Sequence, residues 1–402
     1  MGEKEVRRLC KTIGDERVAE RDAQVSAYQN KPLTERKGVP QGVEAPDVAV
    51  VGVDGGRLQI FERVPKAKQA ETERPSAAGT PEEEIQDDVA LPEAEENAKK
   101  PLYWREDKVG LLMTMASERH AADPCPEIPA SFVNPHWIPE LAKQMGQHGC
   151  ARSSTEDTSA PPSAGAQPET EQVKDKAEWE PPEVLAKQFV ATRRRWLEFG
   201  PMVAAKAWSL GFYGAPRKAF LGDGAENNWT LWRNHFSSFV PILDFIHGLT
   251  YIFHSALAGR PFAEGWEAYQ RWIRWVWAGE VEKVIAELAT RQAELGAPPD
   301  AKATSPAQIV ARALGYLQNN KDRMRYADYR RQGLPIVSSY VESAVNQFNH
   351  RAKGTEKFWR EAGAEEILQL RADHLSDNKP MAQFWQRRQV AESGQTRYRK
   401  AA

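Results

Sequence analysis

Cysteines are few in this sequence, and long hydrophobic runs are absent. The three cysteines, Cys10, Cys125 and Cys150, lie far apart with no Cys-x-x-Cys or Cys/His spacing, so neither a zinc site nor a disulfide framework is indicated. No uninterrupted apolar run approaches the ~18–20 residues of a membrane helix, and no signal peptide is visible. These absences predict a protein of the reducing cytoplasm that has no membrane partner.

A large net charge is also missing, since 54 Lys and Arg residues oppose 56 Asp and Glu residues. The charges are nevertheless segregated along the chain. Residues 69–98 hold ten acidic residues against one base, whereas residues 321–331 hold five bases against two acids, and the segment after Asn346 is also basic. Such segregation suits a protein whose ordered part contacts a polyanion while an acidic segment stays in water.

Two segments have compositions that cannot form a core. Residues 66–100 are acidic and rich in Pro, Ala and Glu, and residues 150–180 are rich in Ser, Thr, Pro and Ala. Neither buries enough apolar surface to offset the entropy of ordering it, so both are predicted to be disordered. The remaining chain is predicted to comprise an N-terminal helical segment (1–44), the first strands of a core (45–65 and 101–149), its second part (181–247), a helical insertion (248–332) and a last core helix with a basic helical tail (333–402).

The stretch PDVAVVGVDGGRLQI (46–60) predicts a buried strand that ends by presenting the carboxylate of Asp54. Three interpretations compete for this residue: it starts a tight hairpin, it belongs to a nucleotide-phosphate loop, or it binds a metal ion. Asp-Gly is a common hairpin turn, so the chain is expected to turn here into a second strand at 57–64. A third strand at 109–115 would complete a three-strand meander.

After residue 180, the pattern predicts one long helix, two short strands and then helices only. The expected elements are a helix at 181–212, a strand at 218–222 ending on Asp223, a strand within 236–247 ending on Asp244, helices through 248–332, and two helices within 333–377. A stripe of large side chains in the insertion is expected to be core: Trp266, Tyr269, Ile273 and Trp277. This element order predicts an α/β fold, a ribonuclease H-like mixed sheet with a large all-helical insertion before its last core helix.

Three carboxylates fall where such a sheet would bring them together. Asp54 and Asp223 follow strands, and Glu342 lies near the start of a helix that begins around Ser338. Mg²⁺ takes oxygen ligands, and phosphoryl transfer by two metal ions needs several converging carboxylates. Taken singly, each has another explanation: a hairpin turn, a strand-to-loop turn, and a capping box formed by Glu342 with Ser339.

Four segments in chain order carry a family resemblance: VVGVDGGRLQI, KAFLGDGAENNW, FVPILDFIHGL and GLPIVSSYVESAVNQFNHRAKGTEKFW. They resemble transposases of bacterial insertion sequences of the Kra-type group, DDE enzymes with a ribonuclease H-like core, from about Ala45 to Trp385. The resemblance implies that Asp54, Asp223 and Glu342 form the catalytic triad and hold two Mg²⁺ or Mn²⁺ ions. It also implies DNA cleavage and strand transfer at the ends of an insertion sequence.

The family also implies the partners and the location of the protein. Double-stranded DNA, as transposon ends and target, is the expected partner, with no small-molecule substrate. The protein is expected to act as a homodimer or higher assembly, in a bacterial cytoplasm and at the nucleoid when bound to DNA.

Asp244 and His247 resemble the D(2)H element that follows the second aspartate in Mutator-like and related transposases, where it lies near the active site or the transferred strand. The resemblance gives this pair an accessory role. From the residues alone, a histidine at a helix start, four residues before Tyr251, is more often structural.

The helix after Glu342 is a candidate DNA contact. Asn346, Asn349 and Lys353 would share its face with Glu342, and His350 and Arg351 would lie beside it. Lys353 and Lys357, in KGTEK, would mark a turn near the DNA backbone. The alternative is a solvated helix face. Phosphate contacts here would make binding strongly dependent on salt without reading the base sequence.

The sequence departs from the family pattern in two places. About fifty residues precede Asp54 and contain no helix-turn-helix or zinc module, and Asn346 stands where a lysine would be more usual. A truncated, non-mobile remnant that only binds DNA is therefore an alternative. A second is an ATP-binding protein of the actin and sugar-kinase kind, whose first phosphate loop also resembles DGG after a strand, although no second glycine-rich loop is present.

Overall fold

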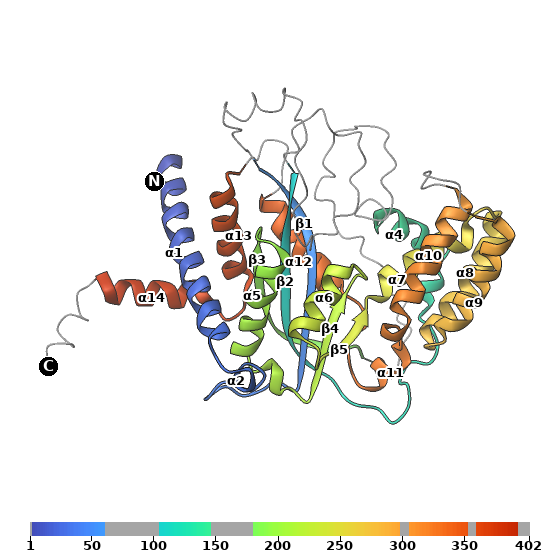
Figure 1. The fold of residues 1–402 in the computed structure, drawn as a ribbon, viewed down its shortest axis with the longest axis horizontal. Coiled ribbons are helices and arrows are strands. Elements are labelled where there is room, and N and C mark those ends of the chain that lie inside the picture. Colours follow the sequence, from blue (N-terminus) through green and yellow to red (C-terminus); the bar gives the residue numbers. More distant parts are fainter. Residues whose placement is uncertain (1, 61–103, 146–179, 298–304, 353–358, 393–402) are drawn as a thin grey trace, which may run out of the picture.

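The computed structural model describes residues 2–60, 104–145, 180–297, 305–352 and 359–392 (Figure 1). The segments predicted to be disordered lie outside these residues, apart from Glu180. Within the described part, no helix is both long and apolar enough to cross a membrane.

A mixed sheet of five strands in the order β3-β2-β1-β4-β5 forms the centre of the molecule (Figure 1). β1, β2 and β3 pair antiparallel in succession, whereas β4 runs parallel to β1 and β5 parallel to β4. The strands are β1 (Val48–Gln59), β2 (Trp104–Ala116), β3 (Glu183–Thr192), β4 (Arg217–Gly222) and β5 (Val240–Leu243). The protein is thus mixed α/β, as the sequence predicted.

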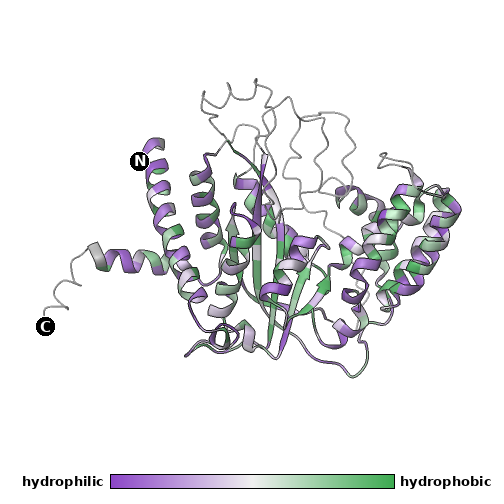
Figure 2. Ribbon diagram, viewed as in Figure 1, coloured by the Kyte–Doolittle hydropathy of each residue, from purple (hydrophilic) through white to green (hydrophobic). Residues whose placement is uncertain are grey.

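Helices cover both faces of the sheet, which explains why its central strands read as continuous apolar runs. A Cβ atom added at Gly110 of β2 would touch Val203 in α5 (Trp196–Ser209), and one at Gly52 of β1 would touch Val341 in α12 (Ser339–Ala352). Gly110 pairs with Val53, the neighbour of Gly52, and neighbouring residues face opposite sides of a sheet. α5 and α12 therefore lie on opposite faces. Figure 2 shows the hydrophobic strands between them.

The outer edge of β3 is closed by the C-terminal part of the chain. The backbone N–H groups of Lys187, Phe189 and Arg193 donate to side chains in and just after α13 (Glu361–Leu375). An open row of such groups would pair with another strand, so these bonds protect the edge. The N-terminal helix α1 (Glu3–Gln29) packs against α13, and α14 (Pro380–Glu392) follows.

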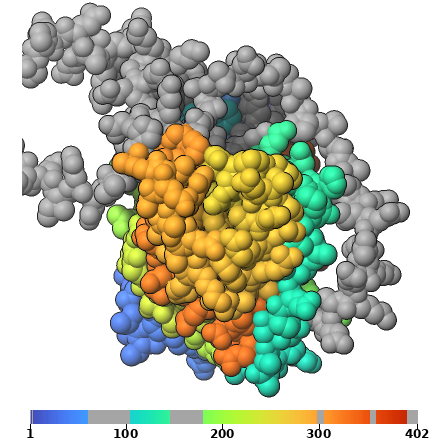
Figure 3. Space-filling model, turned by 90° about the vertical axis from the view of Figure 1, so that its right-hand side faces the viewer, coloured from blue at the N-terminus to red at the C-terminus, as the bar shows by residue number. Residues whose placement is uncertain are grey.

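The helical insertion lies beyond β5 (Figure 1), and Figure 3 views it from its outer side. Tyr269, Ile273 and Trp277 are fully buried and Trp266 partly, so the predicted core stripe is confirmed. The helices of this block are α7 (Phe245–Leu257), α8 (Phe262–Trp277), α9 (Val281–Leu295), α10 (Pro306–Asn320) and α11 (Tyr326–Arg331). Three shorter or flanking helices are α2 (Leu33–Arg36), α4 (Trp137–Met145) and α6 (Glu226–His235).

Two of the five bases in residues 321–331 pack inside the fold. Arg330 is fully buried, forms an ion pair with Asp123 and stacks 3.9 Å from the ring centroid of Trp277. The Arg323 guanidinium lies over the indole of Trp229, 4.3 Å from the ring centroid. Two of the five bases in this run therefore serve packing, whereas Lys321, Arg325 and Arg331 are exposed.

Two predictions of secondary structure are wrong. β1 does not turn at Asp54: it continues to Gln59 and stays paired with β2 throughout, and neither Gly55 nor Gly56 has the positive φ that a tight hairpin needs. The predicted helix at 181–212 begins as strand β3, and only its second half is helical. In both places, pairing with the long strand β2 outweighs the local sequence preference.

Candidate active site

Three aspartates form a row across the parallel strands. The β1–β4 ladder ends with Gly52 opposite Leu221, and the β4–β5 ladder ends with Gly222 opposite Leu243. Continuing both registers places Asp54, Asp223 and Asp244 side by side, on strands spaced about 4.8 Å apart. The Asp244 N–H donates to the Gly222 carbonyl at 2.9 Å, which extends the second ladder to this row.

α12 brings Glu342 to the same row. A Cβ atom at Gly52 would lie 2.4 Å from Cγ2 of Val341, so the absence of a side chain at Gly52 lets α12 approach β1 closely. Asp54 is two residues further along β1 and therefore faces the same side. Glu342, next to Val341, consequently lies over the aspartates.

Asp54 is strongly perturbed by its surroundings. Burial and then the negative charge of Asp223 raise its pKa to about 7, and Glu342 adds to this effect. The Gly55 N–H, which donates to Asp54 Oδ1 at 2.6 Å, and the charge of His247 act in the opposite direction. Asp54 is thus close enough to Asp223 and Glu342 to be repelled by both, although these three side chains do not form a group with ligand atoms within 4.8 Å of one another, as Asp244, His247 and Glu342 do.

Asp223 is held in a turn between β4 and α6. Its Oδ1 accepts hydrogen bonds from the backbone N–H of Ala225 at 2.9 Å and from Asn228 Nδ2 at 2.7 Å. Its carbonyl oxygen accepts a hydrogen bond from the Tyr316 hydroxyl at 2.7 Å. Both the side chain and the backbone of this residue are therefore fixed.

Asp244 is fully buried and accepts four hydrogen bonds. Its Oδ1 accepts from the backbone N–H groups of Ile246 and Ser338, and its Oδ2 from the Ser338 hydroxyl at 2.8 Å and His247 Nδ1 at 2.6 Å. Burial raises its pKa, but the bonds and charge of His247 and the bonds of Ser338 outweigh this and lower it. Asp244 is thus an ionised N-cap of α7 that orients His247.

His247 carries a positive charge into this group of carboxylates. Burial lowers its pKa, but the hydrogen bond and charge of Asp244, followed by the charges of Asp223 and Glu342, raise it to about 9. The imidazolium also lies 3.9 Å from Glu342 Oε1, measured from Nδ1. The accessory pair is therefore brought to the triad.

Glu342 is the least satisfied of the acids. Burial and the charge of Asp244 raise its pKa, while His247 lowers it. Its Oε1 is buried and accepts no hydrogen bond from any residue that the structure describes. Possible ligand atoms of Asp244, His247 and Glu342 lie within 4.8 Å of one another, which makes them a candidate metal group. Asp244 is poorly suited to this role because its oxygens already accept four hydrogen bonds.

The residues predicted to contact DNA do not share one environment. Asn346, His350 and Arg351 are exposed, whereas Asn349 is partly buried, with its Oδ1 beside Gly56 of β1. Asn346 and Asn349 therefore differ in exposure, because α12 packs Asn349 against the sheet, and their contact with DNA stays a prediction. Lys353 and Lys357 lie outside the described residues.

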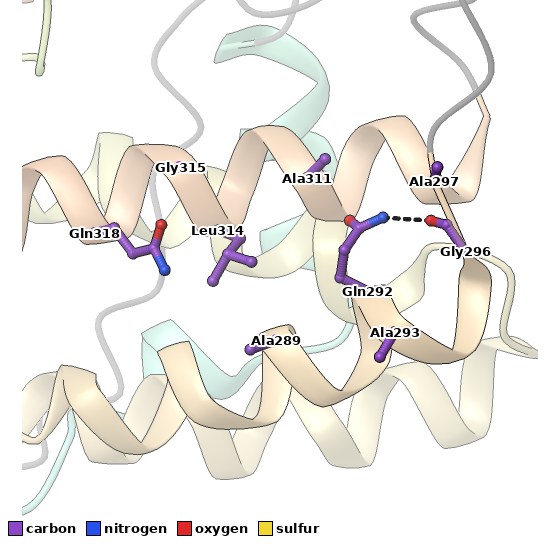
Figure 4. Close-up of a pocket in the computed structure, with 9 residues that line it drawn as sticks. All are labelled: Ala289, Gln292, Ala293, Gly296, Ala297, Ala311, Leu314, Gly315 and Gln318. Atoms are coloured by element: carbon purple, nitrogen blue, oxygen red, sulfur yellow. Dashed lines mark hydrogen bonds between the residues drawn. The ribbon is translucent and has the colours of Figure 1, made fainter.

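Two cavities lie away from the carboxylates. One, of about 560 Å³, is a groove between α9 and α10 whose nine lining residues, mainly Ala and Gly, include no titratable side chain (Figure 4). The other, of about 380 Å³, lies between α1, β3, α5 and α13 and is lined by charged groups such as Arg17 and Asp373, which pair with each other. Neither offers a constellation for catalysis comparable to the aspartate row.

Sequence reasoning missed two residues of the site. Ser338 was noted only as the start of a helix, although a serine at this position is a recognisable N-terminal signal. Tyr316 carries no such signal, because its contact with Asp223 spans 93 residues.

Comparison with known proteins gave no match: no protein-family model matches the chain, and no curated protein or solved structure matches it.

Proposed function

We propose that this chain is a DDE-type DNA transposase with a ribonuclease H-like core, which cleaves the ends of an insertion sequence and transfers the strand to target DNA. The observation that carries the proposal is the register of β1, β4 and β5, which aligns Asp54 with Asp223 beneath Glu342. The strand order supports it too, with three antiparallel strands followed by two parallel ones. The motif resemblance supplies the reaction and its DNA partner.

The residues present fit Mg²⁺ or Mn²⁺. Asp54, Asp223 and Glu342 provide carboxylate oxygens, the ligands that these cations prefer. Burial and mutual repulsion raise the pKa of Asp54 to about 7, and Glu342 Oε1 accepts no hydrogen bond within the described part of the chain. A divalent cation would reduce the repulsion at Asp54 and give Glu342 Oε1 a partner. When bound, two such ions would activate the attacking oxygen and stabilise charge on the leaving oxygen.

The neighbouring residues would hold the substrate and the acids in place. Asp244 fixes the His247 ring through Nδ1, which leaves Nε2 to donate to a phosphate oxygen of the DNA. A charged donor held in this way is stronger than a neutral one. Ser338 fixes Asp244 in turn, so the start of α12 and the start of α7 are tied together beside the triad.

The straight course of β1 argues against the ATP-binding alternative. In such a protein, the glycines after Asp54 would leave the strand to wrap around phosphates, but Gly55 and Gly56 remain paired with Lys108 and Asp107 of β2. No observation favours this function over DNA cleavage.

Cleavage of the DNA that flanks the gene tests the proposal. Duplexes carrying its bracketing inverted repeats are incubated with the protein and Mg²⁺ or Mn²⁺, and nicked and strand-transfer products are resolved on a denaturing gel. We expect products that require the metal and that disappear in Asp223→Ala. Asp328→Ala, which removes an exposed acid paired with Arg331, is the matched control and should remain active. Full activity of Asp223→Ala would rule out the triad.

A further inference from the structure

The turn that carries Asp223 is in direct contact with the helical insertion. Gly224, directly after it, has φ +98°, and a Cβ atom there would lie 2.5 Å from Cε2 of Tyr316 on α10. The Tyr316 hydroxyl donates to the Asp223 carbonyl at 2.7 Å. The Tyr316 ring thus lies against Gly224, while its hydroxyl donates to the carbonyl of Asp223.

A second ring holds Tyr316 in this position. Tyr251 of α7 stacks on it with centroids 3.7 Å apart and an angle of 12° between the ring planes. Tyr251 follows His247 by four residues, so both lie on the same side of α7. The same helix therefore carries the imidazolium of the site and the ring that supports Tyr316.

Asp223 needs such support more than the other two acids do. Asp54 lies inside β1, and Glu342 lies inside α12, so regular backbone hydrogen bonding fixes both. Asp223 follows the last residue of β4, where the strand has ended and α6 has not begun. Its carbonyl is fixed instead by a hydroxyl from a helix 93 residues away.

We propose that Tyr316 is a positioning residue for the metal site, through which the helical insertion sets the position of Asp223. This inference rests on the proposed function. It assigns the insertion a part in building the metal site, in addition to any contact with DNA. Tyr251 acts one step further out, because it holds the Tyr316 ring and not Asp223 itself.

Metal binding to the full chain tests the role directly. Mn²⁺ is titrated calorimetrically into the wild type and into Tyr316→Phe, which keeps the stacked ring and removes only the hydroxyl. Loss of one hydrogen bond of ordinary strength predicts a Kd for Mn²⁺ about fivefold higher. Tyr316→Leu, which also removes the stack, should raise it further.

Tyr269→Phe is the matched control. Its hydroxyl donates at 2.8 Å to the carbonyl of Phe132, which lies between β2 and α4, and it forms no hydrogen bond with the acids. It should leave the Kd for Mn²⁺ within about twofold of wild type. In the nicking assay, Tyr316→Phe should raise the Mn²⁺ concentration that gives half the maximal rate, whereas the rate at saturating Mn²⁺ should change little.

The possible outcomes separate the two proposals. A wild type that binds Mn²⁺ and nicks DNA, with an unchanged Kd in Tyr316→Phe, would overturn the positioning role and leave the proposed function standing. An equal rise in Tyr269→Phe would also overturn it, because loosening of the insertion in general would then explain the effect. A wild type that neither binds Mn²⁺ nor nicks DNA would remove the proposed function and this inference with it.

Discussion

Replacing Asp54 by asparagine should stabilise the metal-free protein while it destroys the metal site. Burial and the charge of Asp223 raise the pKa of Asp54 to about 7. Above that pH, the folded protein carries an ionised carboxylate in a place that disfavours it. An amide of the same shape removes that charge and with it the cost to stability.

The size of the effect follows from the pKa. A shift from 3.8 to about 7 is roughly three pKa units, and each unit corresponds to about 1.4 kcal/mol, so ionisation costs the folded state at most about 4 kcal/mol at pH 8. The amide also changes the hydrogen bonding at this buried position, which offsets about 1 kcal/mol. We therefore expect Asp54→Asn to raise the free energy of unfolding by about 1–3 kcal/mol at pH 8.

The pH dependence gives the sign of the effect. The pKa of Asp54 is higher in the folded than in the unfolded protein. The cost of ionising Asp54 in the folded state is therefore absent below about pH 4 and complete once the pH has risen through 7. Urea unfolding in EDTA, followed by tryptophan fluorescence at pH 5, 6, 7 and 8, should show the advantage of Asp54→Asn growing with pH. Asp328→Asn, at an exposed ion pair, should show no such trend.

Mg²⁺ should cancel or reverse the advantage of Asp54→Asn. A ligand at one hundred times its Kd stabilises the folded state by about 2.7 kcal/mol, and the variant lacks one of the carboxylates needed to bind it. If Asp54→Asn is no more stable than the wild type at pH 8, or if its advantage is equal at pH 5, the carboxylates do not repel one another as the structure indicates.

Three further changes test other parts of the fold. Gly52→Ala should push Val341 and α12 away from β1. We expect the free energy of unfolding to fall by about 1–3 kcal/mol and Mn²⁺ to bind more weakly in calorimetry. An unchanged free energy of unfolding and an unchanged Kd would show that α12 can shift freely. Burial raises the pKa of Glu366 to about 7, so its stabilising protonated form is lost as the pH rises through 7. Glu366→Gln should therefore reduce the pH dependence of the free energy of unfolding in urea between pH 5 and 8. A pH dependence equal to that of the wild type would contradict this. Asp123→Ala should cost about 3–5 kcal/mol in the same assay, because it leaves buried Arg330 unpaired, and a loss below 1 kcal/mol would show that water replaces the carboxylate.

The sequence was sufficient to predict the elements whose signals are local. The strands that end before Asp223 and Asp244, the helical insertion and the helix that carries Glu342 are all present. Each has a short apolar run or a clear helical period, bounded by glycine, proline or a polar residue. Asp223 and Asp244 could be selected for the same reason, because a carboxylate directly after a buried strand is visible in one sequence, whereas Asp54 lies inside β1 and Glu342 inside α12.

Features that depend on distant pairing could not be predicted. The strand at Glu183–Thr192 exists because it pairs with β2, and its sequence, EVLAKQFVAT, suits a helix equally well. The contacts of Tyr316 with Asp223 and of Ser338 with Asp244 each join residues more than ninety positions apart. The alignment of the aspartates depends on strand register, which a single sequence does not contain.

The glycines around Asp54 have a different role from the one that the sequence predicted. The sequence predicted a hairpin turn at Asp54 and Gly55. In the structure both continue the strand, and a Cβ atom at Gly56 would meet Asp107 and Asn349, so its small size serves packing of protein against protein. The glycine that shapes the site is Gly52, since it admits α12 and with it Glu342. Asp54 is therefore placed among the acids by what lies two residues before it, and Gly56→Ala should disturb packing of α12 without moving the aspartates out of register.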